Sequence, residues 1–291
     1  MKRASILFLL IALLTCKVTH AQETVLINVV YEFKYIRDLA DNANPYTSNM
    51  VLSLGKNNSR YCTEKMYLEN KTQPDTKEKM DQQAGKESSS MPKIVVMGGP
   101  MLTLNKYGTL INEQILKDYV NRKLTIWATM GPKDYKIETP WPNISWKVQD
   151  EKKTIGKYNC QKATGSYGGR LYTAWFAPEL HFQDGPWKLS GLPGLILEAS
   201  DSRNEVIFTF KEISKIKDDN ETTASLISYD EQFTINTNLA AYNRSKKAYE
   251  TDPETFWSTA FPNSTLYVNN IDDPNATHAR IIKKYNPMEL K

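Results

Sequence analysis

Histidine and cysteine are scarce in this sequence of 291 residues, which contains three of each. Beyond the N-terminal leader described below, only His181, His278, Cys62 and Cys160 remain. None of the spacings typical of zinc sites occurs, neither CxxC nor HxxxH nor HExxH. The GxSxG nucleophile elbow and the phosphate-binding GxGxxG and GxxxxGK motifs are also missing. We therefore expect no metal site and no cofactor, and the lack of catalytic motifs favours a protein that is not an enzyme.

Long apolar runs are missing as well. The longest run, Ala4 to Leu14, has 11 residues, whereas a membrane-spanning helix needs about 20. It follows Lys2-Arg3 and precedes Thr19-His20-Ala21, an order typical of a secretory signal peptide. We therefore expect residues 1–21 to be a signal peptide and the mature protein to be periplasmic or extracellular, with no membrane span.

Cys16 raises an alternative in which the exported protein is a lipoprotein. Threonine at position 15 and lysine at position 17 fit a lipid-attachment sequence poorly. Soluble export is therefore the favoured interpretation.

A strong charge bias is absent once the signal peptide is set aside. Residues 1–21 contain three basic residues and no acidic one, so the remaining chain has 34 basic and 33 acidic residues and a net charge of +1. A nearly neutral chain gives no electrostatic reason to bind nucleic acid or an anionic membrane surface. We expect neither partner.

The two cysteines of the mature chain form an even pair, Cys62 and Cys160. In an oxidising compartment such a pair suggests one disulfide. The alternative is two independent buried thiols, which behave as small apolar side chains.

The most frequent pattern along the chain is the short alternation of apolar and polar residues that is typical of β-strands. Residues 24–37 show it best, since Val25, Ile27, Val29 and Tyr31 share one face. We expect about ten strands and no helix before residue 214. The strand-like stretches are 24–37, 50–54, 59–63, 94–97, 110–119, 123–129, 133–138, 144–149, 154–163, 170–176 and 204–213.

Two segments differ from this pattern. Residues 69–92 are polar and without apolar periodicity, which indicates a mobile, solvated insertion. Residues 214–291 contain two helix-compatible stretches, 239–250 and 254–260, a short strand-like stretch at 265–268 and a polar tail over 269–291. The expected organisation is a β domain over 22–213 and a C-terminal helical or irregular appendage over 214–291 that packs on the same domain.

This count of strands with short connections predicts a mainly β fold, built as a large curved antiparallel sheet. We expect an open half-barrel with a short C-terminal helical appendage, an arrangement that resembles half-barrel lipoprotein carriers by analogy only. A closed β-barrel and a two-sheet sandwich are alternatives with similar strand counts.

Residues 184–201 combine two turn signals with a strand. Asp184-Gly185-Pro186 is typical of a turn, and Leu192-Pro193-Gly194-Leu195 has the Pro-Gly centre of a type II turn. Leu195-Ile196-Leu197 then begins a short apolar run that predicts a buried strand. The structural motif that this predicts comprises Gly185, Pro186, Gly191, Pro193, Gly194, Leu195 and Ile196.

The hexapeptide Gly191 to Ile196 reads GLPGLI, and the chain resembles the GLPGLI family of secreted Bacteroidetes proteins, whose biochemical function is not established. Upstream blocks are similar too: Gly156-x-Tyr158-x-Cys160-Gln161-Lys162-Ala163, Gly169-Arg170, Ala174-Trp175-Phe176 and Asp184-Gly185-Pro186-Trp187-Lys188. Tyr285 to Leu290 resembles the common C-terminal ending of the family, with Met288 in place of isoleucine. The resemblance implies a bacterial envelope protein and names no activity.

The loop 178–194 before the predicted strand is the candidate ligand site. In a half-barrel we expect such a loop, with an exposed Trp187, to lie at the mouth of an apolar cavity. The candidate mouth residues are Trp187, Leu189, Leu192 and Pro193. The competing interpretation is structural, with Pro193 and Gly194 present for turn geometry and the following apolar residues present for packing.

One hydrolase-like set is compatible with the sequence: Cys160 as a nucleophile, His181 as its base and Asp184 as the group that orients the histidine. Such a pair requires a thiolate with a lowered pKa within hydrogen-bond reach of the imidazole. A buried or bridged Cys160 excludes it.

Three functions follow from the sequence. The favoured one is a non-catalytic binding or carrier protein of the cell envelope for an apolar or amphipathic ligand, such as a lipid or a peptide. The second is an interaction module that docks on another envelope protein by strand addition. The third is an undescribed hydrolase.

Overall fold

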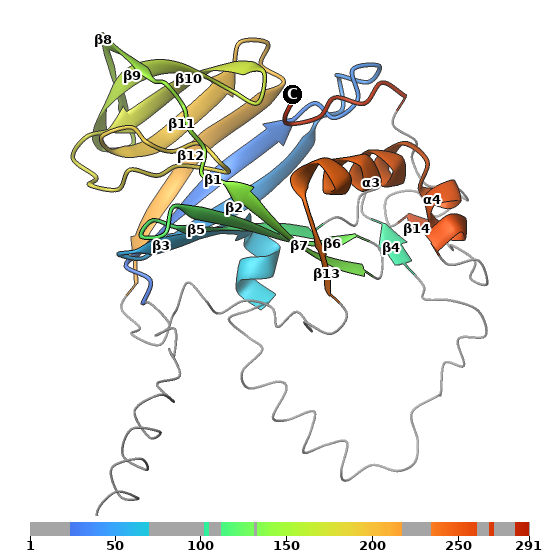
Figure 1. Cartoon of the computed structure of the whole chain (residues 1–291). Coiled ribbons are helices and arrows are strands. Elements are labelled where there is room, and N and C mark those ends of the chain that lie inside the picture. Colours follow the sequence, from blue (N-terminus) through green and yellow to red (C-terminus); the bar gives the residue numbers. More distant parts are fainter. Residues whose placement is uncertain are drawn as a thin grey trace, which may run out of the picture.

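The computed structural model describes residues 24–69, 102–104, 112–130, 133–216, 234–260, 268–270 and 283–290 (Figure 1). The strands are β1 (Ile27–Tyr35), β2 (Tyr46–Leu54), β3 (Asn58–Thr63), β4 (Leu102–Leu104), β5 (Asn112–Asp118), β6 (Lys123–Met130), β7 (Lys133–Pro140), β8 (Lys147–Ile155), β9 (Tyr158–Tyr167), β10 (Arg170–Ala177), β11 (Leu195–Asp201), β12 (Val206–Lys215), β13 (Thr234–Thr237) and β14 (Val268–Asn270). The helices are α3 (Leu239–Thr251) and α4 (Pro253–Ala260).

Twelve of the strands form a single sheet in the order β13-β7-β6-β5-β3-β2-β1-β12-β11-β10-β9-β8. Neighbouring strands are antiparallel except at one edge, where β13 runs parallel to β7. The two edge strands, β13 and β8, do not pair with each other in the described chain, so the sheet is open. The mainly β, half-barrel-like open sheet is therefore confirmed, and the closed barrel and the sandwich are wrong. A separate pair, β4 and β14, forms a small parallel sheet.

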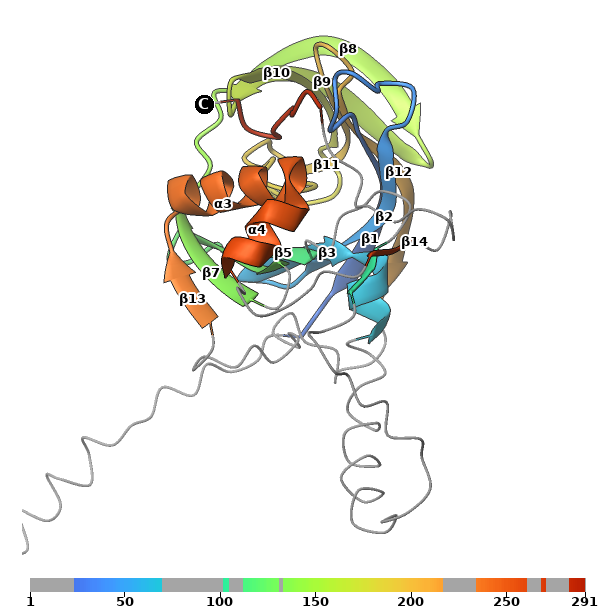
Figure 2. The same cartoon turned by 90° about the vertical axis from the view of Figure 1, so that its right-hand side faces the viewer.

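The sheet curves around its own covering elements. Figure 2 shows it as an arc, with α3, α4 and residues 283–290, the C-terminal segment, on the inner side. Aromatic packing joins α3 to the sheet, since the rings of Tyr135 in β7 and Tyr242 in α3 lie 5.7 Å apart. The C-terminal helical part thus fills the opening of the half-barrel and adds β13 to the edge of the sheet.

Alternating burial along the strands gives the curved sheet one buried face. In β6, Leu124, Ile126, Ala128 and Met130 are buried while the residues between them are partly or fully exposed. Strand β11 is different, because Leu195, Ile196 and Leu197 are all fully buried. Both faces of the sheet are covered there, which confirms the buried strand predicted after the GLPGLI turn.

Local details differ from the sequence prediction. Residues 64–69 form a helix where none was expected, and its first turn is capped by the side chain of Thr63, which accepts a hydrogen bond of 3.2 Å from the backbone N–H of Met66. The single strand expected over 154–163 is a hairpin, because the chain reverses at Gly156, where φ is +58°. Strand β13 was not predicted, because a polar four-residue edge strand has no apolar alternation.

The expected polar tail over 269–291 is the largest correction. Lys283 and Lys284 are exposed, but residues 285–290 pack against the β domain and Asn286 is buried, as described below. The signal peptide over 1–21, residues 70–92 of the expected insertion and the strand expected at 94–97 lie outside the described residues. Among the described residues, no helix has the length and apolar character needed to cross a membrane.

Candidate ligand-binding cavity

The loop between β10 and β11, residues 178–194, crosses the inner side of the curved sheet. Its anchor is Asp184, which is buried and binds residues of β3 and β5. In the sheet order these strands are separated from β10 and β11 by β2, β1 and β12. The carboxylate of Asp184 accepts hydrogen bonds from Ser59 Oγ at 2.6 Å and Tyr119 Oη at 2.7 Å, and it forms an ion pair with Lys117. Burial lowers the pKa of Lys117, and the charge and hydrogen bond of Asp184 partly offset this effect. Asp184 therefore ties the loop down across the half-barrel.

The turn that follows places Trp187 in a strained backbone conformation. The backbone N–H of Leu189 donates to the carbonyl of Pro186 at 3.1 Å, and Trp187 within this turn has a φ of +54°. A bulky residue rarely occupies the left-handed region, at a cost of roughly 1–3 kcal/mol, and such strain is concentrated at functional sites. The indole packs edge-on against Tyr167, with ring centroids 5.5 Å apart.

The GLPGLI turn is tighter than the type II turn that its sequence predicts. The backbone N–H of Gly194 donates to the carbonyl of Leu192 at 2.8 Å, and the N–H of Leu195 bonds instead to the carbonyl of Leu180 at 3.1 Å. Gly194 has no room for a side chain, because a Cβ there would lie 2.3 Å from the carbonyl oxygen of Ala177. The glycine is required by this backbone contact as well as by its φ of +154°.

Two adjoining cavities lie between the sheet, this loop, α3 and the C-terminal segment. The inner cavity has a volume of about 110 Å³ and the outer cavity about 350 Å³. Residues that line both cavities are Tyr35, Glu113, Ile115, Trp187, Lys246 and Met288. Most of the inner cavity's wall is aromatic or apolar, with Phe33, Tyr46, Met50, Tyr61 and Phe208 completing it, and Arg37, Thr63 and Glu250 add polar groups. The outer cavity lies under α3 and is more polar.

A charged pair marks the boundary between the cavities. Glu113 of β5 accepts hydrogen bonds from Tyr242 Oη at 2.6 Å and Lys246 Nζ at 2.5 Å, and both donors come from α3. Burial alone would raise the pKa of Glu113, but the charge of Lys246 and these two hydrogen bonds lower it overall. Burial likewise opposes the charge of Lys246, yet Glu113 and Glu250 raise its pKa. Both groups are therefore charged at neutral pH and dock α3 on the sheet.

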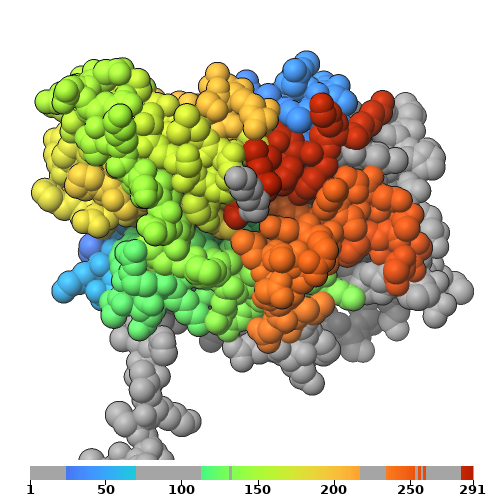
Figure 3. Space-filling model, turned by 45° about the horizontal axis from the view of Figure 1, so that its top comes forward, coloured from blue at the N-terminus to red at the C-terminus, as the bar shows by residue number. Residues whose placement is uncertain are grey.

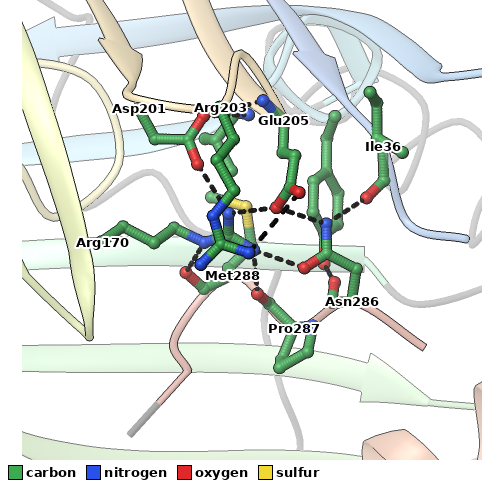
Figure 4. A network of polar contacts seen from close by, with 10 residues as sticks. Ile36, Arg170, Asp201, Arg203, Glu205, Asn286, Pro287 and Met288 are labelled. Carbon is green, nitrogen blue, oxygen red and sulfur yellow. Dashed lines mark hydrogen bonds and ion pairs between the residues drawn. The ribbon is translucent and has the colours of Figure 1, made fainter. Parts of the chain in front are cut away.

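The C-terminal segment forms one wall of the site and is held by Arg170 of β10 (Figure 4). The guanidinium donates to Asp201 and Glu205 at 2.7 Å each, to the Asn286 side chain at 2.6 Å and to the carbonyl oxygens of Pro287 at 2.7 Å and Met288 at 3.0 Å. Five bonds to one buried guanidinium satisfy its whole donor set. These bonds fix residues 286–288 against β10.

Further bonds extend this contact along the segment. Asn286 also donates to the carbonyl of Ile36 at 2.7 Å, and the backbone N–H of Leu290 donates to the carbonyl of Gly168 at 2.6 Å. Lys188, next to Trp187, forms an ion pair with Glu289. Figure 3 shows the C-terminal residues, in red, between the orange helical part and the blue N-terminal region.

Three of the sequence blocks behind the family resemblance therefore meet at one place. Gly169-Arg170, Asp184 to Lys188 and Tyr285 to Leu290 are more than a hundred residues apart at the extremes, yet the last block contacts each of the other two directly. Sequence reasoning recognised the blocks but did not select Arg170, Asn286, Glu113 or Lys246 as site residues. The only signal for Arg170 and Asn286 was their position inside those blocks, and Glu113 and Lys246 had none.

The four candidate mouth residues have different surroundings. Trp187 lines both cavities but is only 7% exposed, so the expectation of an exposed tryptophan is wrong. Residues 184–190 of the loop are buried, and Trp187 shares the wall of the outer cavity with residues of α3 and of the C-terminal segment. Leu189 and Leu192 are buried in the core and do not line either cavity, whereas Pro193 is exposed. Leu189, Leu192 and Pro193 therefore lie where residues that serve packing and turn geometry are expected, and not at the mouth of a cavity.

The expected disulfide is not formed. Cys62 and Cys160 are both free and buried. Cys62 is in β3 and Cys160 is in β9, and five strands separate them in the sheet. The alternative of two independent buried thiols is the one observed.

The surroundings of Cys160 are the reverse of those that a nucleophilic cysteine requires. Burial raises the pKa of its thiol to about 11, with a further rise from the charge of Glu198. Its thiol contacts the carbonyl of Tyr158 at 3.7 Å, while His181 is exposed. Asp184 is engaged by Ser59, Lys117 and Tyr119 and is not placed to orient a histidine. Within the described ranges no group of three or more His, Cys, Asp or Glu side chains could hold a metal ion.

Comparisons with known proteins add little to this geometry. No protein-family model matches the chain, and no curated protein matches it. Among solved structures it is similar to PNGF-II in the P21 space group, with 15% identity and a TM-score of 0.48, and to PNGF-II in the C2 space group, with 13% identity and a TM-score of 0.47. Each match covers 76% of this chain and 32% of the other. The chain thus spans about a third of the length of those proteins, and at this similarity the likeness carries no conclusion about function.

Proposed function

We propose that this protein is a non-catalytic binding protein of the cell envelope that holds an apolar or amphipathic ligand inside its half-barrel. The observation that carries the proposal is the pair of adjoining cavities on the inner side of one open sheet, one aromatic and one polar. Ligand sites are typically concave, mostly apolar and equipped with a few placed polar groups. Export through the signal peptide and membership of the GLPGLI family belong to the same proposal.

Two features of the inner cavity support binding rather than mere imperfect packing. Its wall contains the strained Trp187, and strain at a cavity wall is typical of a functional position. Its aromatic rings offer large apolar surfaces. Tyr35 donates its hydroxyl hydrogen to the carbonyl of Asn286, whereas the buried hydroxyl of Tyr61 has no hydrogen-bond partner within the described residues.

Docking by strand addition is the alternative, and the two edges of the sheet do not favour it. Edge strand β8 carries Lys147, Asp150, Glu151, Lys152 and Lys153 and has an irregular register between Val148 and Lys152. Charged, bulged edges oppose pairing with another chain. The opposite edge, β13, is only four residues long. A protein partner would therefore have to use another surface.

Native mass spectrometry of the mature protein, purified under mild conditions from its own cells, tests this proposal. We expect an added mass of several hundred daltons or less that is lost on denaturation. A protein of bare mass together with a stably co-purified protein partner would contradict the proposal and support the docking module.

A cavity-filling variant locates the binding. Ile115 lines both cavities, and Ile115→Trp should abolish the added mass by occupying their shared region. Leu116→Trp, at the next position of β5 and on the opposite face, is the matched control and should retain it. Melting temperatures of both variants show whether the fold persists. Equal retention by both variants would place any ligand outside the cavities.

A further inference from the structure

The two cavities differ in chemistry, and the difference defines a ligand class. The inner cavity, at about 110 Å³, is on the scale of a single aromatic ring, since an apolar cavity of about 150 Å³ in another protein binds benzene. A long acyl chain does not fit such a volume. The inner cavity therefore suits a ring or a short branched apolar group.

The outer cavity has an excess of positive charge. Four basic residues line it, Lys188, Arg244, Lys246 and Lys247, against two acidic ones, Glu113 and Glu289. Lys246 is paired with Glu113 and Lys188 with Glu289. Within the described part of the chain, Arg244 and Lys247 form no ion pair. Two uncompensated cations therefore remain at this cavity.

Both cations are on α3, three positions apart, so they lie on the same side of the helix. Both are exposed to solvent. Figure 3 shows α3, in orange, on the accessible face of the molecule beside the C-terminal segment. The cavity that these cations line adjoins the aromatic cavity, with which it shares six lining residues.

We propose that the ligand is a small carboxylate that carries an aromatic or short branched apolar group. This inference rests on the proposed function and narrows it. The apolar group occupies the inner cavity against Trp187, and the carboxylate is bound by Arg244 and Lys247 in the outer cavity. Arginine suits this role because its planar fork of donors matches a carboxylate. The same chemistry is offered by a free aromatic acid and by the C-terminal residue of a peptide.

Isothermal titration calorimetry with matched probes tests the charge requirement. The probes are 3-phenylpropanoate and its uncharged amide, the tripeptide Gly-Gly-Phe with a free and with an amidated C-terminus, and palmitate. We expect the carboxylates to bind at least about tenfold more tightly than their amides, since a hydrogen bond to a charged group is lost in each amide. Preference for the tripeptide or for the free acid identifies the source. Failure of both carboxylates to bind, or equal binding of the amides, would overturn the inference.

Paired variants test the position of the charge. Arg244→Gln with Lys247→Gln should weaken carboxylate binding about tenfold or more and remove its dependence on salt. Lys147→Gln with Lys152→Gln on the edge strand β8 makes the same change in net charge and should leave the affinity unaltered. All four side chains are exposed, so folding is expected to be retained.

The inference and the proposed function fail in different ways. Tight binding of palmitate that is insensitive to the α3 variants but lost in Ile115→Trp would reject the anion site and leave the binding protein intact. Absence of binding by every probe, with a bare native mass, would reject both.

Discussion

Single residues in this protein have roles that depend on one close contact. Gly194 is the clearest case, because a Cβ there would meet the backbone of Ala177 while Gly191, in the same hexapeptide, has open space at that position. Both glycines have positive φ values, +154° and +95°. The two sites therefore separate the cost of backbone conformation from the cost of a steric clash.

We expect Gly194→Ala to lower the free energy of unfolding by about 3 kcal/mol, from overpacking against a rigid backbone in addition to conformational strain. Gly191→Ala is the control and should cost only about 1–2 kcal/mol from conformation. Urea denaturation followed by circular dichroism measures both. Similar losses for the two variants would show that the contact with Ala177 is unimportant.

Trp187 shows a second kind of dependence at the residue scale. Its strained φ is maintained because its turn is closed by the Pro186–Leu189 hydrogen bond and the loop is tied at Asp184. Neighbouring structure thus maintains a conformation that the residue itself disfavours. The indole consequently lines both cavities and at the same time belongs to the hydrophobic core that contains β11.

At the scale of elements, two charged pairs attach α3, Glu113–Lys246 to β5 and Arg37–Glu250, at 3.8 Å, to the residues after β1. The helix buries Tyr242 and Tyr249, and its polar link to β5 is the Glu113–Lys246 pair with Tyr242. The side chains of this pair are 28% and 20% exposed, so solvent screens their interaction only partly. Its contribution should therefore be measurable through pH.

The pH range in which the Glu113–Lys246 pair stabilises the fold follows from the direction of each pKa shift. The pKa of Glu113 is lowered, so its contribution is present above the ordinary carboxyl value of 4.5 and is lost as the pH falls through the folded value. The pKa of Lys246 is raised, so its contribution is present below 10.5 and is lost as the pH rises through the folded value. We expect the pair to stabilise the docked helix by about 1–2 kcal/mol between these limits.

Thermal melts from pH 3 to 11 of the native chain and of Glu113→Gln should therefore differ most near neutral pH and converge in acid. Glu138→Gln is a matched control, because Glu138 pairs with Lys123 at the surface, where both side chains are about half exposed. That variant should change stability by less than about 1 kcal/mol. Parallel pH profiles for the native chain and Glu113→Gln would contradict the assigned role.

At the scale of the whole molecule, Arg170 closes the fold around the C-terminus. Its partners come from β11, from the turn between β11 and β12, and from residues 286–288. Asn286 in turn binds Ile36, directly after β1. One buried cation thus joins β10 and β11 to residues 286–288.

Arg170→Met should lower the free energy of unfolding by about 3–5 kcal/mol, because it leaves two buried carboxylates without their cation. Arg203→Met provides the control, since Arg203 is exposed and contacts Glu205 at 3.7 Å, and should cost at most about 1 kcal/mol. Urea denaturation gives both values, and limited proteolysis reports whether residues 283–290 come loose. A loss below about 1 kcal/mol for Arg170→Met would mean that the network does not hold the C-terminus.

The sequence by itself determined the kind of structure. Alternation of apolar and polar side chains depends only on neighbours along a strand, so the β-rich fold and the buried strand after GLPGLI were predictable from local pattern. The turn residues Gly185, Pro186 and Gly194 were predictable for the same reason. The same local pattern did not separate the open sheet from a closed barrel or a sandwich, because it does not show whether the edge strands pair. Local pattern failed where no periodicity exists, as at β13, or where one glycine turns a long run into a hairpin, as at Gly156.

Only the tertiary structure decided which distant residues share a site. Arg170 and Asn286 are 116 positions apart and Lys188 and Glu289 are 101 apart, and no local propensity encodes such contacts. Curvature of the sheet decides them, because it brings the crossing loop, α3 and the C-terminus to one inner face. The same curvature turned an expected tail into a wall of the cavity and buried Trp187, whereas the order of the strands placed five strands between Cys62 and Cys160.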